Sequence, residues 1–266
     1  VLLWMSSPVL AWWISVPPKI TKSRVLSSGQ TRSLRLIARR TWRFFETFVD
    51  ERSHGLPLDN FQEDPEPVEA RRTSPTNLGL YLLGTVAARD FGWIGTLEMV
   101  ERLEVTLRTM SGLRRVRGHF LNWYDTGDLR PLLPMYVSTV DSGNLGGYLI
   151  ALAQACREHV HRPVAGPEFL QGIGDALSLL TDAMRGAESS PRAQTVTAAQ
   201  LREAAEATAA ALQMLPATIP EQLHRLHELE SRADDLLDIA RTFASEIHDD
   251  SRTEILTWAS AVHDCV

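Results

Sequence analysis

The stretches Asn77-Leu-Gly-Leu-Tyr-Leu-Leu83 and Asn144-Leu-Gly-Gly-Tyr-Leu-Ile150 form an internal repeat, offset by 67 residues. A unit made of two helices and a hairpin has about that length, so the repeat predicts helical hairpins that stack in a ring or solenoid. The shared glycines fit this layout because a missing side chain lets neighbouring helices approach closely. The alternative is a chance similarity between two apolar helices.

Outward from this repeat, apolar residues at helical spacing dominate and alternating strand-like runs are nearly absent, which predicts a mostly α-helical chain. We expect helices to start at Ser74-Pro75 and near Asp141, where short polar side chains can accept hydrogen bonds from first-turn amides. Within residues 117–131 the turn Asp125-Thr-Gly-Asp128, between aromatic flanks, predicts a short β-hairpin. The predicted helices span residues 31–50, 75–90, 95–111, 142–158, 167–186, 196–214, 219–247 and 250–265.

The first 45 residues contain eight basic residues and no acidic one, whereas the remainder carries 19 basic against 33 acidic residues. Residues 1–16 form an uncharged apolar run that is slightly shorter than the roughly 20 residues of a spanning helix. We expect the truncated end of a transmembrane helix, with Trp12 and Trp13 at the headgroup level. The basic flank would then place the following domain on the cytoplasmic side. A buried core helix or a clipped signal sequence is the alternative.

Composition excludes several classes of protein. A hydrophobic content of 44% is too high for a disordered chain, and a net charge of -6 argues against a nucleic-acid binder. Two cysteines, Cys156 and Cys265, exclude a disulfide scaffold, and Cys156 is expected in the core. We predict no metal site, because Asp234-Asp235-Leu-Leu-Asp238 has no second metal motif and His224 and His227 lack the His-Glu-x-x-His pattern.

Three polar clusters carry the residue types that bind sugars, since carboxylates and amides pair with hydroxyls and aromatic rings cover apolar sugar faces. The alternatives are a solvated acidic loop for the first cluster, aromatics that cover the core for the second, and a helix cap at Asp141 for the third. The clusters are Asp59, Asn60, Gln62, Glu63 and Asp64; then Asn122, Trp123, Tyr124 and Asp125; then residues 138–144 around Asp141.

Glycoside chemistry typically uses two carboxyl groups, one as proton donor and one as base or nucleophile. Within the polar clusters, Glu63, Asp64, Asp125 and Asp141 are the candidates for these two carboxyl groups. Their spacing identifies no pair, so Glu63, Asp125 and Asp141 are weak catalytic candidates.

Six segments in order, covering roughly residues 35–160, resemble the middle, glycoamylase-like region of bacterial cyclic β-1,2-glucan synthases. They are Arg39-Arg-Thr-Trp-Arg-Phe-Phe-Glu-Thr-Phe48, Leu58-Asp-Asn-Phe-Gln-Glu-Asp-Pro65, Arg72-Thr-Ser-Pro-Thr-Asn-Leu-Gly-Leu-Tyr-Leu-Leu83, Ala87-Ala-Arg-Asp-Phe-Gly-Trp93, Gly118-His-Phe-Leu-Asn-Trp-Tyr-Asp-Thr126 and Tyr136-Val-Ser-Thr-Val-Asp-Ser-Gly-Asn144.

The resemblance implies a polytopic inner-membrane enzyme. A glycosyltransferase domain makes linear β-1,2-glucan from UDP-glucose, a middle (α/α)6 domain cyclises it by transglycosylation, and a phosphorylase-like domain trims it. This chain would be a fragment on the cytoplasmic side, with the glucan and the rest of the polypeptide as partners and no cofactor. Its parts would be a truncated transmembrane segment (residues 1–18), a basic linker (19–33), the first part of an incomplete (α/α)6 toroid (34–164) and an Ala/Leu/Glu-rich helical extension of that domain (165–266).

A six-hairpin toroid needs about 12 helices, so the ring cannot close within this chain. We therefore expect the main catalytic carboxylates outside it and expect the fragment alone to be inactive. On this view Asp59, Asn60, Gln62, Glu63 and Asp64 form one wall of a glucan groove, with Trp123, Tyr124 and Asp125 opposite. The alternatives are a stand-alone secreted β-1,2-glucanase and a non-catalytic helical interaction module, whose polar loops would not share a cleft.

Overall fold

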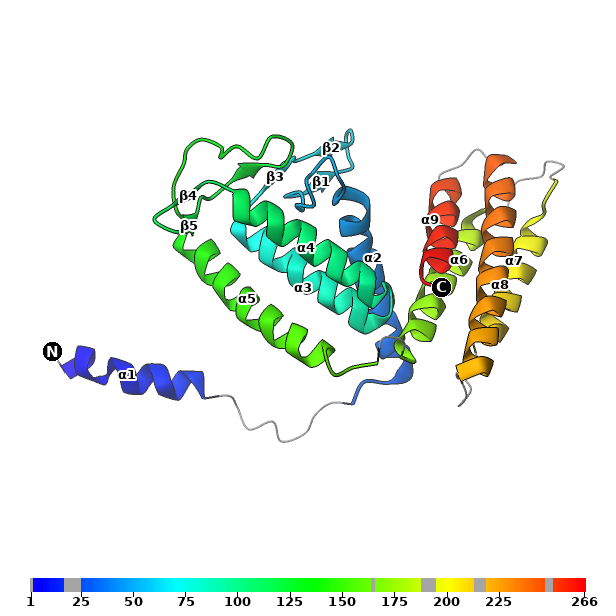
Figure 1. The fold of residues 1–266 in the computed structure, drawn as a ribbon, viewed down its shortest axis with the longest axis horizontal. Helices are drawn as coiled ribbons and strands as arrows, with labels where there is room; N and C mark the ends of the chain where they lie inside the picture. The colour runs from blue at the N-terminus through cyan, green and yellow to red at the C-terminus, as the bar shows by residue number, and fades with distance from the viewer. Residues whose placement is uncertain (1, 17–24, 164–165, 188–194, 213–218, 247–250) are drawn as a thin grey trace. The chain divides into compact units, whose positions relative to one another are not determined.

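The computed structural model describes residues 2–16, 25–163, 166–187, 195–212, 219–246 and 251–266 (Figure 1). It divides into two compact units, Val1–Leu34 and Arg35–Val266. Helices dominate the described residues, so the predicted mainly helical class is confirmed. The incomplete toroid stays a prediction.

The first unit contains α1 (Leu2–Ser15), an apolar helix with Pro8 inside it. Among the described residues, no helix combines the length and the apolar character that crossing a membrane requires. The predicted truncated transmembrane segment is therefore not confirmed. Residues 17–24, which include the start of the predicted linker 19–33, lie outside the described residues.

All eight helices predicted beyond residue 30 are present, with ends that shift by a few residues. The first of them begins in the first unit and continues into the second. They are α2 (Ser28–Phe48), α3 (Pro75–Phe91), α4 (Thr96–Gly112), α5 (Thr139–His159), α6 (Glu168–Ala187), α7 (Ala198–Ala211), α8 (Ile219–Glu246) and α9 (Ser251–Asp264).

The starts of α3 and α5 follow the capping rule in different ways. The Ser74 side chain accepts from the Asn77 amide and Pro75 takes the first helical position, as predicted. In α5 the Ser138 hydroxyl accepts from the Asp141 amide, so the helix starts before residue 142. The prediction that Asp141 caps this helix is therefore wrong, and the Asp141 carboxylate is left for other partners.

Among the described residues of the second unit, short strands form three antiparallel pairs. They are β1 (Phe61–Gln62) with β2 (Val68–Glu69), β3 (Arg72–Thr73) with β6 (Tyr124–Asp125), and β4 (Arg115–Val116) with β5 (His119–Phe120).

The predicted hairpin at residues 117–131 is present only in part. Its Asp125–Asp128 turn closes through one isolated bridge between Tyr124 and Pro131. Pro131 lacks an amide N–H, so it cannot extend this ladder, and β6 pairs with β3 instead. A tighter hairpin, β4–β5, turns at Arg117 and Gly118, both with positive φ.

The second unit has two apolar cores. Helices α2 to α5 and their loops enclose one, around side chains such as Trp42, Leu78 and Tyr81. Helices α6 to α9 enclose the other, around side chains such as Phe243 and Trp258. Residues 165–266, predicted as an extension of the first domain, thus supply a core of their own.

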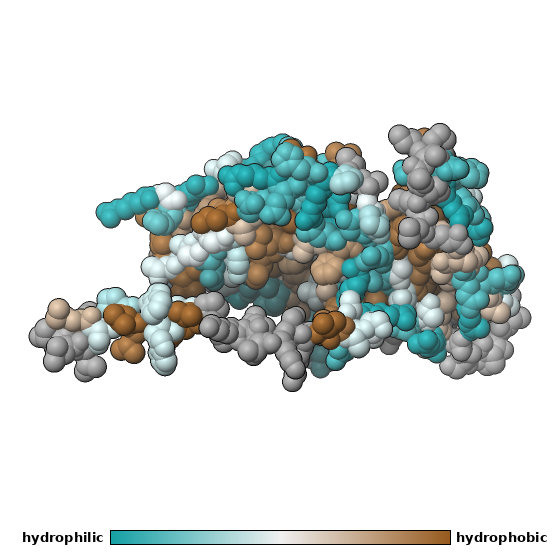
Figure 2. Space-filling view, turned by 90° about the horizontal axis from the view of Figure 1, so that it is seen from below, coloured by the Kyte–Doolittle hydropathy of each residue, from teal (hydrophilic) through white to brown (hydrophobic). Residues whose placement is uncertain are grey.

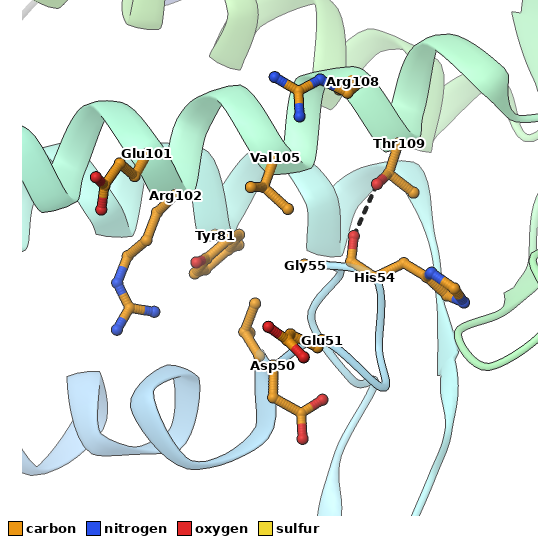
Figure 3. Close-up of a pocket in the computed structure, with 11 residues that line it drawn as sticks. Asp50, Glu51, His54, Gly55, Tyr81, Glu101, Arg102, Val105, Arg108 and Thr109 are labelled. Atoms are coloured by element: carbon orange, nitrogen blue, oxygen red, sulfur yellow. Dashed lines mark hydrogen bonds between the residues drawn. The ribbon is translucent and has the colours of Figure 1, made fainter.

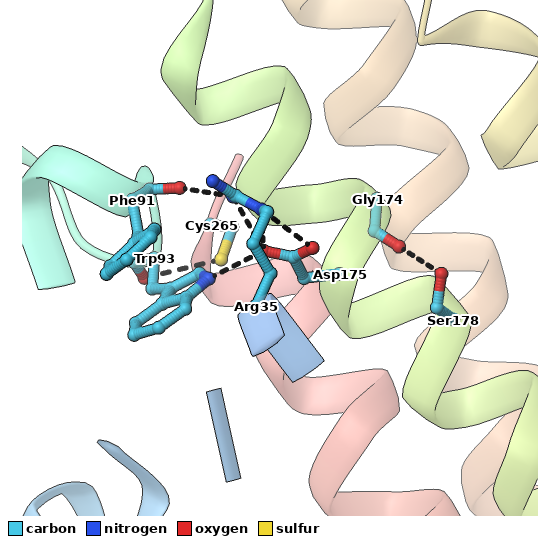
Figure 4. Close-up of polar contacts among 7 residues, drawn as sticks. All are labelled: Arg35, Phe91, Trp93, Gly174, Asp175, Ser178 and Cys265. Carbon is cyan, nitrogen blue, oxygen red and sulfur yellow. Dashed lines mark hydrogen bonds and ion pairs between the residues drawn. The ribbon is translucent and has the colours of Figure 1, made fainter. Parts of the chain in front are cut away.

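Two contacts join these cores across the start of α6. The Asp175 carboxylate accepts from Arg35 Nε at 3.0 Å, from Arg35 Nη2 at 2.6 Å and from Trp93 Nε1 at 2.9 Å (Figure 4). The backbones of Gly92 and Gly172 meet directly, because a Cβ on Gly172 would lie 2.0 Å from the Gly92 carbonyl oxygen. Both contacts need a specific residue type at positions far apart in sequence.

The two cysteines differ in their surroundings. Cys156 is exposed, so the expectation that it lies in the core is wrong; it lies on the outward face of α5, while its neighbour Ala155 packs against the core. Cys265 donates through Sγ to the Trp93 carbonyl oxygen at 3.3 Å, and burial raises the pKa of its thiol to about 12.

We expect N-ethylmaleimide at pH 8 to label Cys156 quickly and Cys265 only after unfolding. A thiol with a pKa of about 12 is thiolate in about one molecule in ten thousand at pH 8, and the thiolate is the nucleophile. Peptide mass spectrometry after timed labelling measures both rates, with 6 M guanidinium as the unfolded reference. Equal labelling of the two thiols in the native protein would contradict the raised pKa of the partly buried Cys265 thiol.

Candidate functional site

The two repeat helices pack against each other, so their equivalent first turns lie side by side. A Cβ on Gly79 of α3 would lie 2.1 Å from a ring carbon of Tyr148 of α5, so only glycine permits this approach. The predicted role of the shared glycines is thus confirmed for Gly79. At Gly146, its repeat equivalent, a Cβ would meet nothing within 4 Å.

Asp59 lies at the centre of the polar side chains near these helix starts. Its Oδ1 accepts from Asn77 Nδ2 at 3.2 Å, in the first turn of α3. Its Oδ2 accepts from Arg72 Nε at 3.1 Å, from Arg72 Nη2 at 3.0 Å and from Asn60 Nδ2 at 3.0 Å. The predicted loop residues Asp59 and Asn60 are thereby fixed to the start of a repeat helix.

Trp123 reaches the same place through strand pairing. The register of β3 with β6 sets Arg72 opposite Asp125 and brings the Arg72 guanidinium to 4.6 Å from the centroid of the Trp123 ring. A cation over an aromatic face contributes about 0.5–1 kcal/mol at an exposed site. Asp59 and Trp123 therefore both contact one arginine, Asp59 through the guanidinium N–H groups and Trp123 through its ring face.

Asp141, in the first turn of α5, belongs to a second hydrogen-bonded group beside the first. Its carboxylate accepts from the Thr76 hydroxyl, which in turn accepts from Asn144 Nδ2 at 3.2 Å. The asparagines of the repeat, Asn77 and Asn144, thus belong to two hydrogen-bonded groups, which the consecutive residues Thr76 and Asn77 of α3 bring next to each other. We call the two groups together the rim; its members are Asp59, Arg72, Thr76, Asn77, Trp123, Asp141 and Asn144.

The rim residues Arg72, Thr76 and Asn77 lie outside the three clusters predicted from the sequence, and Asn144 lies in the third cluster but was not assigned to the groove. The identical asparagines of the repeat, Asn77 and Asn144, were a usable signal, because a polar residue repeated near the start of two packed helices marks a shared edge. Arg72 carried no such signal, since its partners follow from strand pairing.

Three other predicted residues lie in the β1–β2 hairpin, Gln62 at the end of β1 and Glu63 and Asp64 in the loop that follows. Gln62, Glu63 and Asp64 are exposed there, and Gln62 Nε2 donates to the Glu66 carbonyl oxygen at 3.4 Å. Their exposure is compatible with a solvated acidic loop and equally with a loop that binds a ligand. Among the catalytic candidates, Glu63 is thus on a different element from Asp125 and Asp141.

Tyr124 and Asp125 have local structural partners. The Tyr124 side chain is fully buried, and its hydroxyl donates to the Arg114 carbonyl oxygen at 2.6 Å and accepts from the Leu121 amide at 2.7 Å. Burial raises the pKa of this phenol. Asp125 Oδ1 accepts from the amides of Gly127 and Asp128 at 2.8 and 3.1 Å, which shapes the turn.

A cavity of about 440 Å³ lies elsewhere, between the end of α2, the turn before residue 56 and α4 (Figure 3). Thr109 Oγ1 closes one side by donating to the His54 carbonyl oxygen at 2.7 Å. The predicted site residues do not line it, and its mixed charges favour no particular ligand. Its lining residues are Val49, Asp50, Glu51, His54, Gly55, Tyr81, Glu101, Arg102, Val105, Arg108 and Thr109.

Within the described ranges, no three His, Cys, Asp or Glu side chains are grouped so as to hold a metal ion. The polar chemistry of the rim is instead that of hydrogen bonding: two carboxylates accept, while two amides and one guanidinium donate.

No family model matches the chain. The chain is 40% identical to the cyclic beta-(1,2)-glucan synthase NdvB of Rhizobium meliloti (strain 1021), over an alignment of 266 residues that covers 98% of this chain. It spans 9% of the length of that synthase. The resemblance to a segment of a cyclic β-1,2-glucan synthase is therefore confirmed along nearly the whole chain, including α6 to α9.

Proposed function

We propose that the rim binds a β-1,2-glucan chain within the domain of a cyclic β-1,2-glucan synthase that cyclises the glucan by transglycosylation. The observation that carries the proposal is that Asp59, Trp123 and Asp141, which belong to three separate sequence clusters, meet at the starts of the two repeat helices. The 40% identity to a cyclic β-1,2-glucan synthase supports the choice of ligand.

The chemistry of the rim suits a neutral, hydroxyl-rich chain. Asp59 and Asp141 offer carboxylate oxygens to sugar hydroxyls, while Asn77 and Asn144 offer amide donors and acceptors. The partly exposed Trp123 offers an apolar ring for the face of a glucose unit. Because these groups already hold one another, little side-chain entropy is lost when they bind a ligand.

The rim acids act as acceptors in this proposal. Arg72 pairs with Asp59 at 3.0 Å, and Asn77 donates to the other oxygen of the same carboxyl group, so both oxygens are already held as hydrogen-bond acceptors. We therefore assign the rim to substrate positioning and place the reacting carboxyl groups in the rest of the polypeptide. In this setting the domain would lie at the cytoplasmic side of the bacterial inner membrane and need no cofactor.

Replacing Trp123 with alanine is expected to weaken binding of linear β-1,2-glucan about tenfold, or about 1.4 kcal/mol, because an aromatic platform is lost. Asp59→Asn is expected to weaken it to a similar degree by removing the acceptor charge held by Arg72 and Asn77. Isothermal titration with linear β-1,2-glucan measures both changes, and circular dichroism confirms that each variant folds.

Asp128→Asn is the matched control, since Asp128 is exposed and pairs with Arg130 in the neighbouring loop. It should leave the affinity unchanged. If Trp123→Ala folds and retains the parental affinity, glucan binding at the rim is refuted. Failure of the parental protein to bind would favour the helical interaction module instead.

A further inference from the structure

Through the internal repeat, one flank of α5 corresponds to a flank of α3 that is covered by other side chains. Residues 146, 150 and 153 share this flank, since they are spaced by four and three positions along a helix. With the repeat offset of 67 residues they correspond to residues 79, 83 and 86. We call Gly146, Ile150 and Ala153 the α5 flank; its covered counterparts on α3 are Gly79, Leu83 and Val86.

The two flanks differ sharply in exposure. On α3, Gly79 lies under the Tyr148 ring, Leu83 is partly buried and Val86 is 7% exposed. On α5, Ile150 is 75% exposed and Ala153 is also exposed.

Gly146 completes this open surface, because a Cβ there would meet nothing within 4 Å. Val140, also on α5, is 71% exposed. Viewed from below, apolar atoms coloured brown are open at the surface of the second unit (Figure 2). The next helix in sequence, α6, packs against α3, α7 and α9 and leaves the α5 flank free.

We propose that the α5 flank is the docking surface for a third repeat helix of a longer polypeptide. An aromatic side chain of that helix sits over Gly146, as Tyr148 sits over Gly79. Two observations select this occupant. The repeat relates a covered flank to an uncovered one at the same positions, and the matched segment is only 9% of the related synthase. An exposed isoleucine on a flank with two small residues is the surface that an apolar helix face covers.

The inference rests on helix packing and is independent of glucan binding. It also fixes direction: each repeat helix offers its glycine flank to the helix that follows in the repeat. On this proposal, helices α6 to α9 lie in the sequence between the second and the third repeat helix. In space they do not cover the α5 flank.

The test compares the 266-residue protein with a polypeptide of synthase length that contains it. In a Cys156→Ser background, Gly146→Cys should react with a maleimide rapidly in the short protein. In the long polypeptide the rate should fall at least tenfold. Gly112→Cys at the exposed end of α4, where a Cβ also meets nothing within 4 Å, is the matched control and should react equally in both. Equal rates for Gly146→Cys in both proteins would overturn the proposal.

A second measurement covers the case in which the cysteine variant disturbs folding. Gly146→Leu should leave the thermal midpoint of the short protein unchanged or raised, because leucine favours a helix more than glycine does. In the long polypeptide it should lower the midpoint by several degrees, because the leucine side chain would occupy the position of the aromatic ring proposed to lie over residue 146. Gly79→Leu should lower the midpoint in both proteins. An unchanged midpoint for Gly146→Leu in the long polypeptide would refute the docked helix.

Discussion

Gly172→Ala is expected to destabilise the protein by about 3 kcal/mol, the upper part of the range for overpacking a close-packed site. The new Cβ would lie 2.0 Å from the carbonyl oxygen and 2.4 Å from the carbonyl carbon of Gly92. Both are backbone atoms, so no side-chain rotation can relieve the clash. Gly92 cannot move easily. It caps the C-terminus of α3 with φ 80°, and a Cβ on Gly92 would itself lie 2.1 Å from the Glu168 carbonyl oxygen.

Gly174→Ala in the same helix is the matched control. Its Cβ would meet only Leu212 Cδ1, at 3.9 Å, which is ordinary contact. Alanine in a helix is favoured over glycine by up to about 1 kcal/mol, so this variant should be as stable as the parent or more stable. Urea unfolding of the three proteins measures the difference. A Gly172→Ala variant as stable as Gly174→Ala would show that α6 does not approach Gly92 as closely as described.

The helices were predictable because their signals are local. Helical spacing of apolar residues and the Ser74-Pro75 start lie within one element, and each predicted helix beyond residue 30 is present. The contact between Gly92 and Gly172 was not predictable, because the two glycines are 80 positions apart and no local sequence pattern marks either of them. The same limit explains why Arg72 was missed at the rim.

The second polar cluster shows why the site was predicted only in part. Trp123 and Tyr124 are neighbours in sequence, and both were assigned to the glucan groove. Adjacent side chains in an extended segment point to opposite faces, so one of the two must turn inward. Trp123 stays partly exposed over Arg72, whereas Tyr124 is fully buried. Sequence alone identified the pair without its orientation.

Asp175→Ala is expected to destabilise the protein by about 3 kcal/mol, as much as Gly172→Ala. This value is at the low end for breaking a buried ion pair. The Asp175 side chain is 8% exposed and that of Arg35 is 18% exposed, so solvent screens the pair only weakly. Removing the carboxylate leaves the Arg35 charge with the Phe91 carbonyl oxygen as its remaining described acceptor. It also takes away the acceptor of Trp93 Nε1, a group in a buried side chain.

Asp182→Ala, on the same helix α6, is the matched control for the loss of a charged pair. Asp182 pairs with Arg185 at 2.8 Å, but the two side chains are 41% and 72% exposed, so the loss should stay below about 0.5 kcal/mol. Urea unfolding at pH 7 compares the two variants with the parent.

A double-mutant cycle separates the ion pair from the rest of the Asp175 contact. Arg35→Met keeps most of the apolar stem of the side chain, so in the Asp175→Ala background it should cost little or recover stability, because no unpaired charge remains. The coupling energy should then be about 2 kcal/mol, and the residual loss belongs to the bond from Trp93 Nε1. If Asp175→Ala cost no more than Asp182→Ala, the Asp175 contact would not help to hold the two cores of the second unit together, and the close backbone approach of Gly92 and Gly172 would carry that role without it.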